Sequence, residues 1–199
     1  MALFDTLKRA AMNALKKEIT ETAQEKTRDV GKGTNREEKF TFGELPVSVA
    51  QLQAMPEAKL DTPFKTAALT MAVLCHYGKD PEATFEMLNV LKGPAPITNP
   101  EKQFIRERLT GKVYKPLSFF EGATPDNGYV PKQPYTISIM ENPYSFDNAG
   151  WAVLWVKSSG GDHPRQLKLR HKPSTNQWFL NEIQCLSDIR IPVAEDPWA

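Results

Sequence analysis

Cysteine is scarce in this chain of 199 residues, which contains only Cys75 and Cys185. Two cysteines are too few for the disulfide framework of a small secreted domain. Cys75 stands in an apolar run, so we expect a small buried side chain rather than a reactive thiol. Net charge is nearly absent too, because 25 basic and 24 acidic residues give +1. Such a chain has no general field that attracts nucleic acid, and no nucleic-acid partner is expected.

Long hydrophobic runs are also missing. No segment approaches the roughly 20 apolar residues of a membrane span. The N-terminal stretch contains no unbroken apolar run of signal-peptide length, so a cytoplasmic protein is the default expectation. Hydrophobic residues make up 40% of the chain, which is enough for one domain with a substantial core.

Several catalytic signatures are absent as well. The chain has no GxSxG elbow, no Walker loop and no dinucleotide fingerprint. Its three histidines, His76, His163 and His171, have no carboxylate or cysteine at a recognisable ligand spacing, so neither a metal nor a cofactor is predicted. Cys75 and His76 are adjacent, but neighbours on a helix point apart and cannot form a nucleophile–base pair. These absences favour a non-catalytic domain.

The first 28 residues predict an amphipathic helix. Its apolar stripe includes Leu3, Phe4, Leu7 and Leu15, while basic residues occupy much of the remaining surface. The segment that follows is polar and lacks periodicity, so we divide the chain into a helix (1–28), a linker (29–39) and a single domain (40–199).

The domain begins with a predicted strand in "EKFTFGEL" and a short helix capped by Ser48. Three helices follow at 61–78, 80–93 and 99–111. Each has a capping residue (Asp61 or Thr62, Asp80, Asn99), a proline in its first turn and a glycine at its end. The first of the three is apolar almost all round, which predicts a central position in the core.

Strand-like runs occupy the second half of the chain: "YTISIM", "GWAVLWVK", "RQLKLRHK" and "WFLNEIQCL". Short connections between the last three indicate an antiparallel meander. The predicted fold class is α+β, with a curled antiparallel sheet of four to five strands packed against three or four helices. We expect Trp155 to lie beside Leu167 on the core face of this sheet.

The stretch "SSGGDHPRQLKLRHK" (158–172) admits two interpretations. Gly160 and Gly161 would supply the positive φ of a hairpin turn, which explains the stretch without a ligand. An anion-binding loop is less favoured, because such loops lead into a helix and this one leads into a strand. The basic strand face of Lys168 and Arg170 still provides a weak indication of an anionic partner.

A loop rich in proline, glycine and aromatic residues precedes these strands. Aromatic side chains in such a loop either close the end of the core or face a ligand, and the sequence does not decide between these. The candidate ligand-binding residues are Phe119, Phe120, Asn127, Tyr129 and Tyr135, with Arg165 as a polar anchor.

The second half of the chain resembles an uncharacterised family of bacterial domains of unknown function. The matching elements are "FFEGATPDNGYVPKQPYTI", "SSGGDHPRQLKLR", "WFLNEI", "DIRIP" and "EDPW", and the resemblance covers about residues 45–198. It implies a bacterial origin and carries no established activity. The meander that ends in "NQWFL" is also similar, more loosely, to the sheets of nuclear-transport-factor-like folds, a likeness of fold alone.

Two functions follow as expectations. The first is a non-catalytic binding or adaptor domain for a protein or a small ligand, whose N-terminal helix oligomerises or docks on a partner. Docking of this helix on its own domain is an alternative, and peripheral membrane contact is less favoured because the later charges mix signs. The second function is a small enzyme that pairs an acid, Glu121 or Asp126, with a histidine in a pocket between helices and sheet.

Overall fold

The computed structural model describes residues 35–198 and confirms the α+β class. The predicted helix at 1–28 and the first part of the predicted linker lie outside the described residues. The elements are β1 (Glu37–Phe42), α2 (Val49–Ala54), η1 (Pro56–Lys59), α3 (Pro63–Leu74), α4 (Pro81–Lys92), α5 (Asn99–Leu109), α6 (Tyr114–Leu117), η2 (Pro125–Asn127), β2 (Tyr135–Met140), β3 (Trp151–Val156), β4 (Arg165–Lys172), β5 (Gln177–Gln184) and η3 (Val193–Glu195).

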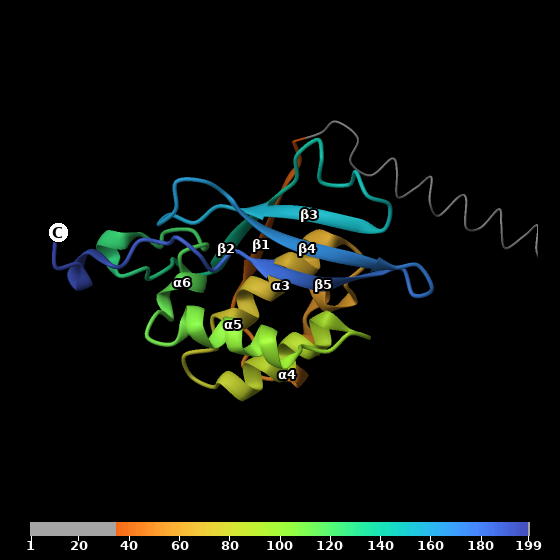
Figure 1. The fold of residues 1–199 in the computed structure, drawn as a ribbon, viewed down its shortest axis with the longest axis horizontal. Coiled ribbons are helices and arrows are strands. Elements are labelled where there is room, and N and C mark those ends of the chain that lie inside the picture. The colour runs from red at the N-terminus through yellow and green to blue at the C-terminus, as the bar shows by residue number, and fades with distance from the viewer. Residues whose placement is uncertain (1–34, 199) are drawn as a thin grey trace, which may run out of the picture.

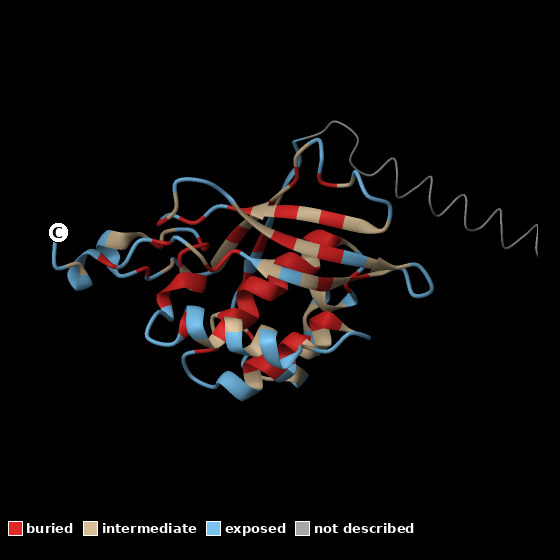
Figure 2. Ribbon diagram, in the orientation of Figure 1, coloured by how far each residue is buried: buried red, intermediate tan, exposed pale blue. Residues whose placement is uncertain are grey.

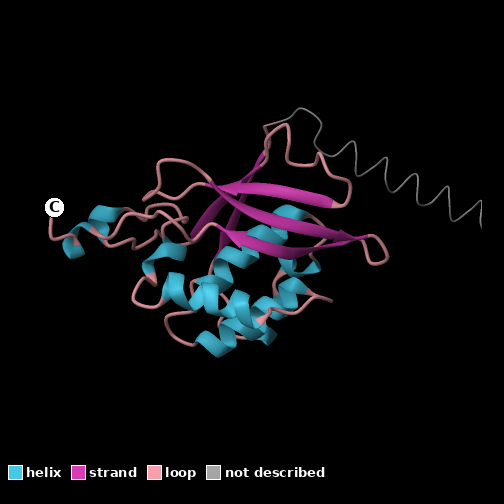
Figure 3. Cartoon of the chain, in the orientation of Figure 1, coloured by secondary structure: helices cyan, strands magenta, loops and turns pink. Residues whose placement is uncertain are grey.

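The five strands form one antiparallel sheet in the order β1-β2-β3-β4-β5. Strands β3, β4 and β5 form the meander that their short connections predicted. Strand β2 pairs with β3 and extends the meander, and β1 pairs with β2 at one edge. The helices α3, α4 and α5 lie on one face of the sheet, and no helix of residues 35–198 lies on the other face (Figures 1 and 3). Strand β5 is the second edge of the sheet.

Helix α3 is the centre of the core. Every residue of α3 except Lys65 is buried, as its nearly continuous apolar sequence predicted, and it contacts all five strands. Figure 2 shows this buried helix directly beneath the sheet. Its two threonines do not disturb the core, because Thr66 donates to the carbonyl of Trp178 and Thr70 donates to the carbonyl of Thr66, both at 2.7 Å.

Side-chain caps begin the three main helices. Thr62 and Asp80 accept hydrogen bonds from the first turns of α3 and α4, as predicted. The cap of α5 is Thr98 and not Asn99, so that prediction was wrong. Thr98 and Glu101 form a reciprocal capping box, in which each side chain accepts from the backbone N–H of the other. The Thr-x-x-Glu spacing outweighs asparagine's own capping preference.

The prediction of which β3 side chains face the core was also wrong. Leu154 pairs with Leu167, and Trp155 pairs with Gln166. The core face of β3 therefore carries its small and aliphatic residues, Ala152, Leu154 and Val156, and both tryptophans lie half-buried on the face without helices. Because β3 is apolar on both faces, alternation alone could not tell which face meets α3.

A β-bulge interrupts the pairing of β4 with β5. Consecutive residues of β4 pair with Leu180 and Glu182, which leaves Asn181 as the extra residue. The bulge reverses the alternation that follows it. Leu180 and Ile183 therefore both face the helices, although three positions separate them, and the side chain of Glu182 lies on the other face.

The loop between β3 and β4 is a hairpin connection that leads into a strand, as expected. The conformation predicted for its glycines was wrong, since neither Gly160 nor Gly161 has a positive φ. Gly160 serves close packing instead. It is buried, and a Cβ at this position would collide with the hydroxyl of Tyr129 and lie 2.9 Å from Ile189 Cγ2.

Candidate functional site

The aromatic residues of the predicted ligand site lie mainly inside the core. Phe119, Phe120 and Tyr129 are 4%, 2% and 0% exposed, respectively. Tyr129 stacks on Tyr114 with ring centroids 5.2 Å apart, and the half-buried Tyr135 makes an edge contact with Phe120. This packing favours the interpretation in which these rings close the end of the core.

The two polar residues of that predicted site hold the main chain. Asn127 donates to the carbonyls of Gly122 and Val130 and accepts from Thr124 N–H, which fixes the loop around η2. Arg165 donates to the carbonyls of His163, Ser187 and Asp188 and so ties the C-terminal segment to β4. The hydrogen-bonding groups of both side chains are engaged in the fold itself.

The predicted anion-binding pair lies on the face without helices. The ammonium of Lys168 and the guanidinium of Arg170 lie over the ring of Trp151, at 5.4 and 5.1 Å from its centroid. This cation–π contact forms because Trp151 lies on the same face of the sheet as the two basic residues. An anionic partner for this pair stays a prediction.

Among the hydrogen bonds and ion pairs of residues 35–198, none joins Glu121 or Asp126 to a histidine. Glu121 pairs with Lys39 at 2.9 Å, and His171 lies against Trp178 with ring centroids 4.7 Å apart. His163 precedes β4, whereas His171 lies near the end of that strand. Burial raises the pKa of the Cys75 thiol above its ordinary range and that of Cys185 to about 12, which makes both poor nucleophiles.

Within residues 35–198, no group of three or more His, Cys, Asp or Glu side chains is arranged to hold a metal ion. In the same residues, no helix is both long and apolar enough to cross a bilayer.

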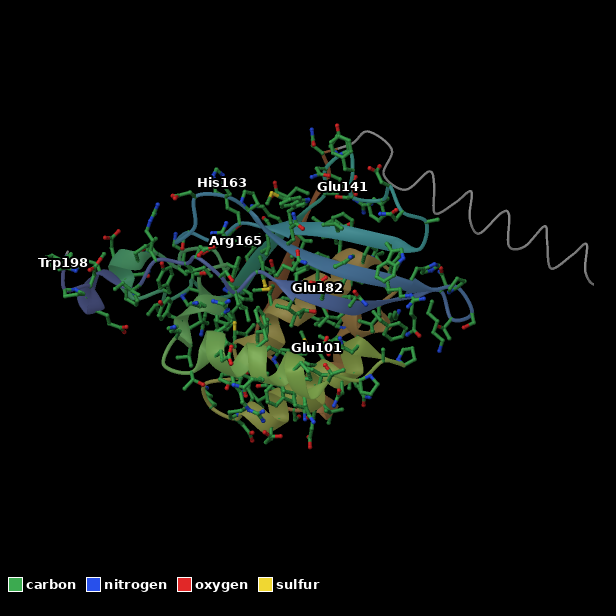
Figure 4. The ribbon with its side chains drawn as sticks, viewed as in Figure 1. Glu101, Glu141, His163, Arg165, Glu182 and Trp198 are labelled. Atoms are coloured by element: carbon green, nitrogen blue, oxygen red, sulfur yellow. The ribbon has the colours of Figure 1, made fainter. Side chains whose placement is uncertain are left out.

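A groove with a cavity volume of about 430 Å³ lies between helix α5 and the edge strand β5. The volume falls within the range of ligand-binding pockets, roughly 300–1,000 Å³. Figure 4 labels Glu101 on α5 and Glu182 on β5, the elements that form the two walls. The lining residues are Lys92, Ile97, Pro100, Glu101, Phe104, Ile105, Leu180, Asn181, Glu182, Ile183, Gln184 and Ser187.

The walls of the groove are largely apolar. One face of α5 supplies Pro100, Phe104 and Ile105, and β5 supplies Leu180 and Ile183. The bulge in β5 is what turns both of these strand residues toward the helices. Phe104 and Ile183 are only half-buried, so part of this apolar surface remains open to solvent.

An ion pair between the buried Lys92 and the half-buried Glu101 forms the polar part of the groove. Lys92, at the end of α4, is 7% exposed, and its ammonium donates to Glu101 Oε1 at 2.6 Å and to the carbonyl of Asn181 at 3.1 Å. Asn181 is the bulge residue, so Lys92 satisfies a carbonyl on the outer edge of β5. A buried lysine is stable only when it is paired in this way. The pair joins α4, α5 and β5 at a fixed point.

Glu101 is held in its charged form. Partial burial alone would raise the pKa of this carboxyl, but hydrogen bonds from Lys92 and from the N–H and hydroxyl of Thr98 bring the pKa below its ordinary value. Both carboxylate oxygens are occupied, one by Lys92 and the other by Thr98. The carboxylate therefore orders the groove and is poorly placed to act as an acid or base.

The sheet wall of the groove includes main-chain atoms. At the start of β5 the outer edge is covered, because Trp178 N–H donates to the carbonyl of Leu60 at 2.7 Å. Among the described residues, no main-chain hydrogen bond joins Glu182–Gln184 to any segment other than β4. The side chain of Glu182 points to the other face, whereas Ile183 turns its side chain toward the helices and its main-chain groups toward the free edge.

Sequence reasoning missed this site. Two signals could have indicated it. The apolar spacing Trp178–Leu180–Ile183 breaks strict alternation, which is typical of a bulge. Lys92 stands beside Leu91 at the buried end of a helix and so required a partner, and the capping-box glutamate that begins the next helix could supply it.

Comparison with known proteins supplies a family and no activity. The family model described as "Domain of unknown function (DUF6935)" matches residues 44–193. No curated protein matches the chain. No solved structure matches it either.

Proposed function

We propose that this chain, which belongs to the DUF6935 family of domains of unknown function, is a non-catalytic binding module that takes its ligand in the groove between α5 and β5. The proposal is carried by one observation: the groove combines apolar walls that are partly open to solvent with a single ordered ion pair, Lys92–Glu101. Ligand sites in proteins commonly combine an apolar cleft with a few ordered polar groups.

A binding role fits the groove better than the alternative, a small enzyme. The lining residues include two glutamates and a lysine but no histidine. Lys92 and Glu101 bind each other and neighbouring backbone groups, which leaves neither in position to exchange a proton with a substrate. The groove favours a ligand whose apolar part packs against Phe104 and Ile183.

The wider role proposed for the molecule is that of an adaptor. The amphipathic segment 1–28 lies outside the described residues, and we retain self-association or partner docking through Leu3, Phe4, Leu7 and Leu15 as part of the proposal. A cytoplasmic location and a bacterial origin likewise remain proposals that rest on the sequence.

The proposal predicts that the full-length protein binds Nile red, a neutral apolar dye, in the groove with saturable fluorescence. Replacing Phe104 with alanine should weaken this binding by about tenfold or more, because it removes a large part of one apolar wall. Tyr135→Ala is the matched control, since Tyr135 is also a half-buried aromatic but belongs to the site predicted from the sequence.

The two variants separate the two sites. Loss of dye binding in Phe104→Ala with retention in Tyr135→Ala supports the groove. The opposite pattern would assign binding to the aromatic loop, and the absence of saturable binding to the wild type would contradict the proposed function. Circular dichroism melts of each variant establish that the fold is kept.

A further inference from the structure

We propose that the ligand of this groove is an extended peptide that adds as a sixth strand to the free edge of β5. This inference rests on the proposed function, because it assigns the chemistry of the ligand for the same groove. An edge strand presents unpaired N–H and C=O groups, and pairing with a second chain is the usual way to satisfy them.

The fold already covers part of this edge. The turn before α3 pairs with the start of β5 through Leu60 and Trp178, and Lys92 satisfies the carbonyl of Asn181. Beyond these two points, the edge at Glu182–Gln184 has no main-chain partner among residues 35–198 apart from β4. The open edge and the groove lie side by side, because Glu182, Ile183 and Gln184 line the groove. A peptide strand paired there would lie about 4.8 Å from β5.

The two faces of β5 specify the side chains of the peptide. Toward the helices, the peptide would meet the apolar walls at Ile183 and Phe104. On the opposite face it would lie beside the carboxylate of Glu182, which is exposed. Side chains of a strand alternate between faces, and opposite charges on neighbouring strands attract each other. The peptide that fits this edge therefore alternates apolar and basic residues.

The test uses the full-length protein and a fluorescein-labelled, seven-residue peptide that alternates lysine and valine and is blocked at both ends. Fluorescence anisotropy should show saturable binding. Ile183→Ser should weaken binding by about tenfold, because it removes apolar surface from the groove. Val153→Ser is the matched control, a half-buried aliphatic on a central strand and on the face without helices, and it should stay within about twofold of the wild type.

Main-chain pairing is tested with two N-methylated forms of the same peptide. One carries methyl groups on its valine amides and the other on its lysine amides. A strand presents alternate residues to each of its edges, so one methylated form should lose binding and the other should keep it. Equal binding by both forms, loss of binding by both, or no binding of the parent peptide would overturn the inference. If Nile red still binds and responds to Phe104→Ala in that case, the proposed function stands while the peptide inference fails.

Discussion

Replacing Gly160 with valine is expected to destabilise the domain by about 3 kcal/mol, at the upper end of the usual cost of overpacking a core. The added Cβ would collide with the hydroxyl of Tyr129. Tyr129 cannot move aside easily, because it is fully buried and donates to the carbonyl of Arg190 at 2.7 Å. The carbonyl of Gly160 also accepts from Arg190 N–H at 2.9 Å, so the valine would disturb three connected groups.

Gly161→Ala is the control for this variant. The nearest atom to a Cβ at Gly161 is Arg165 Nη2 at 3.4 Å, an ordinary contact with the end of a flexible side chain. The control should therefore change the free energy of unfolding by less than about 1 kcal/mol. Urea denaturation of both variants measures the difference. Equal effects of the two substitutions would contradict the packing role of Gly160.

Replacing Lys92 with methionine is expected to destabilise the protein by about 2 kcal/mol at neutral pH. Removing one partner of a fully buried ion pair costs roughly 3–5 kcal/mol, and partial exposure of Glu101 reduces that figure. Methionine keeps most of the apolar stem of lysine. The decrease in the free energy of unfolding therefore measures the contribution of the ammonium and its bonds to Glu101 and Asn181. Lys102→Met is the control, because Lys102 is a half-buried cation that lies over the ring of Phe85 and should contribute about 1 kcal/mol or less.

The stability lost in Lys92→Met is predicted to depend on pH. The folded-state pKa of Glu101 lies below its ordinary value of 4.5, because hydrogen bonds from Lys92 and Thr98 outweigh the effect of burial. A depressed carboxyl pKa contributes stability that is fully present above pH 4.5 and is lost as the pH falls through the folded-state value. The stability difference between the wild type and Lys92→Met should therefore shrink in acid. A difference that stays constant from pH 7 to pH 3 would show that the ion pair does not cause it.

The parts of the fold that sequence predicted are those where local and tertiary requirements agree. In helix α3 the threonine cap and the proline in the first turn predict where the helix begins, and the apolar surface on every side predicts its central position. The meander of β3, β4 and β5 follows from connections too short for any other pairing.

The errors came from tertiary contacts that one segment does not encode. Strand β3 is apolar on both faces, so the position of α3 and not the alternation decided which residues enter the core. The glycines of the β3–β4 loop suggested a turn conformation, whereas Gly160 is required by a tyrosine about 30 residues away in the sequence. The bulge at Asn181, which shapes the groove, depends on register between two strands.

The candidate site was missed for the same reason. The aromatic loop predicted a site at Phe119, Phe120 and Tyr129, but these side chains are buried in the core. The groove is made of residues that look ordinary in sequence: a lysine at a helix end, a capping glutamate and a phenylalanine on an amphipathic helix. Only the packing of α5 beside an edge strand brings them together.

Photolabelling locates the binding site most directly. The full-length protein is irradiated with a small aliphatic diazirine, and the labelled residues are identified by mass spectrometry. Binding in the groove predicts labels on α5 at Pro100–Ile105 and on β5 at Leu180–Gln184. Labels confined to the aromatic loop at 119–135, with none on α5 or β5, would contradict the assignment of the binding site to the groove.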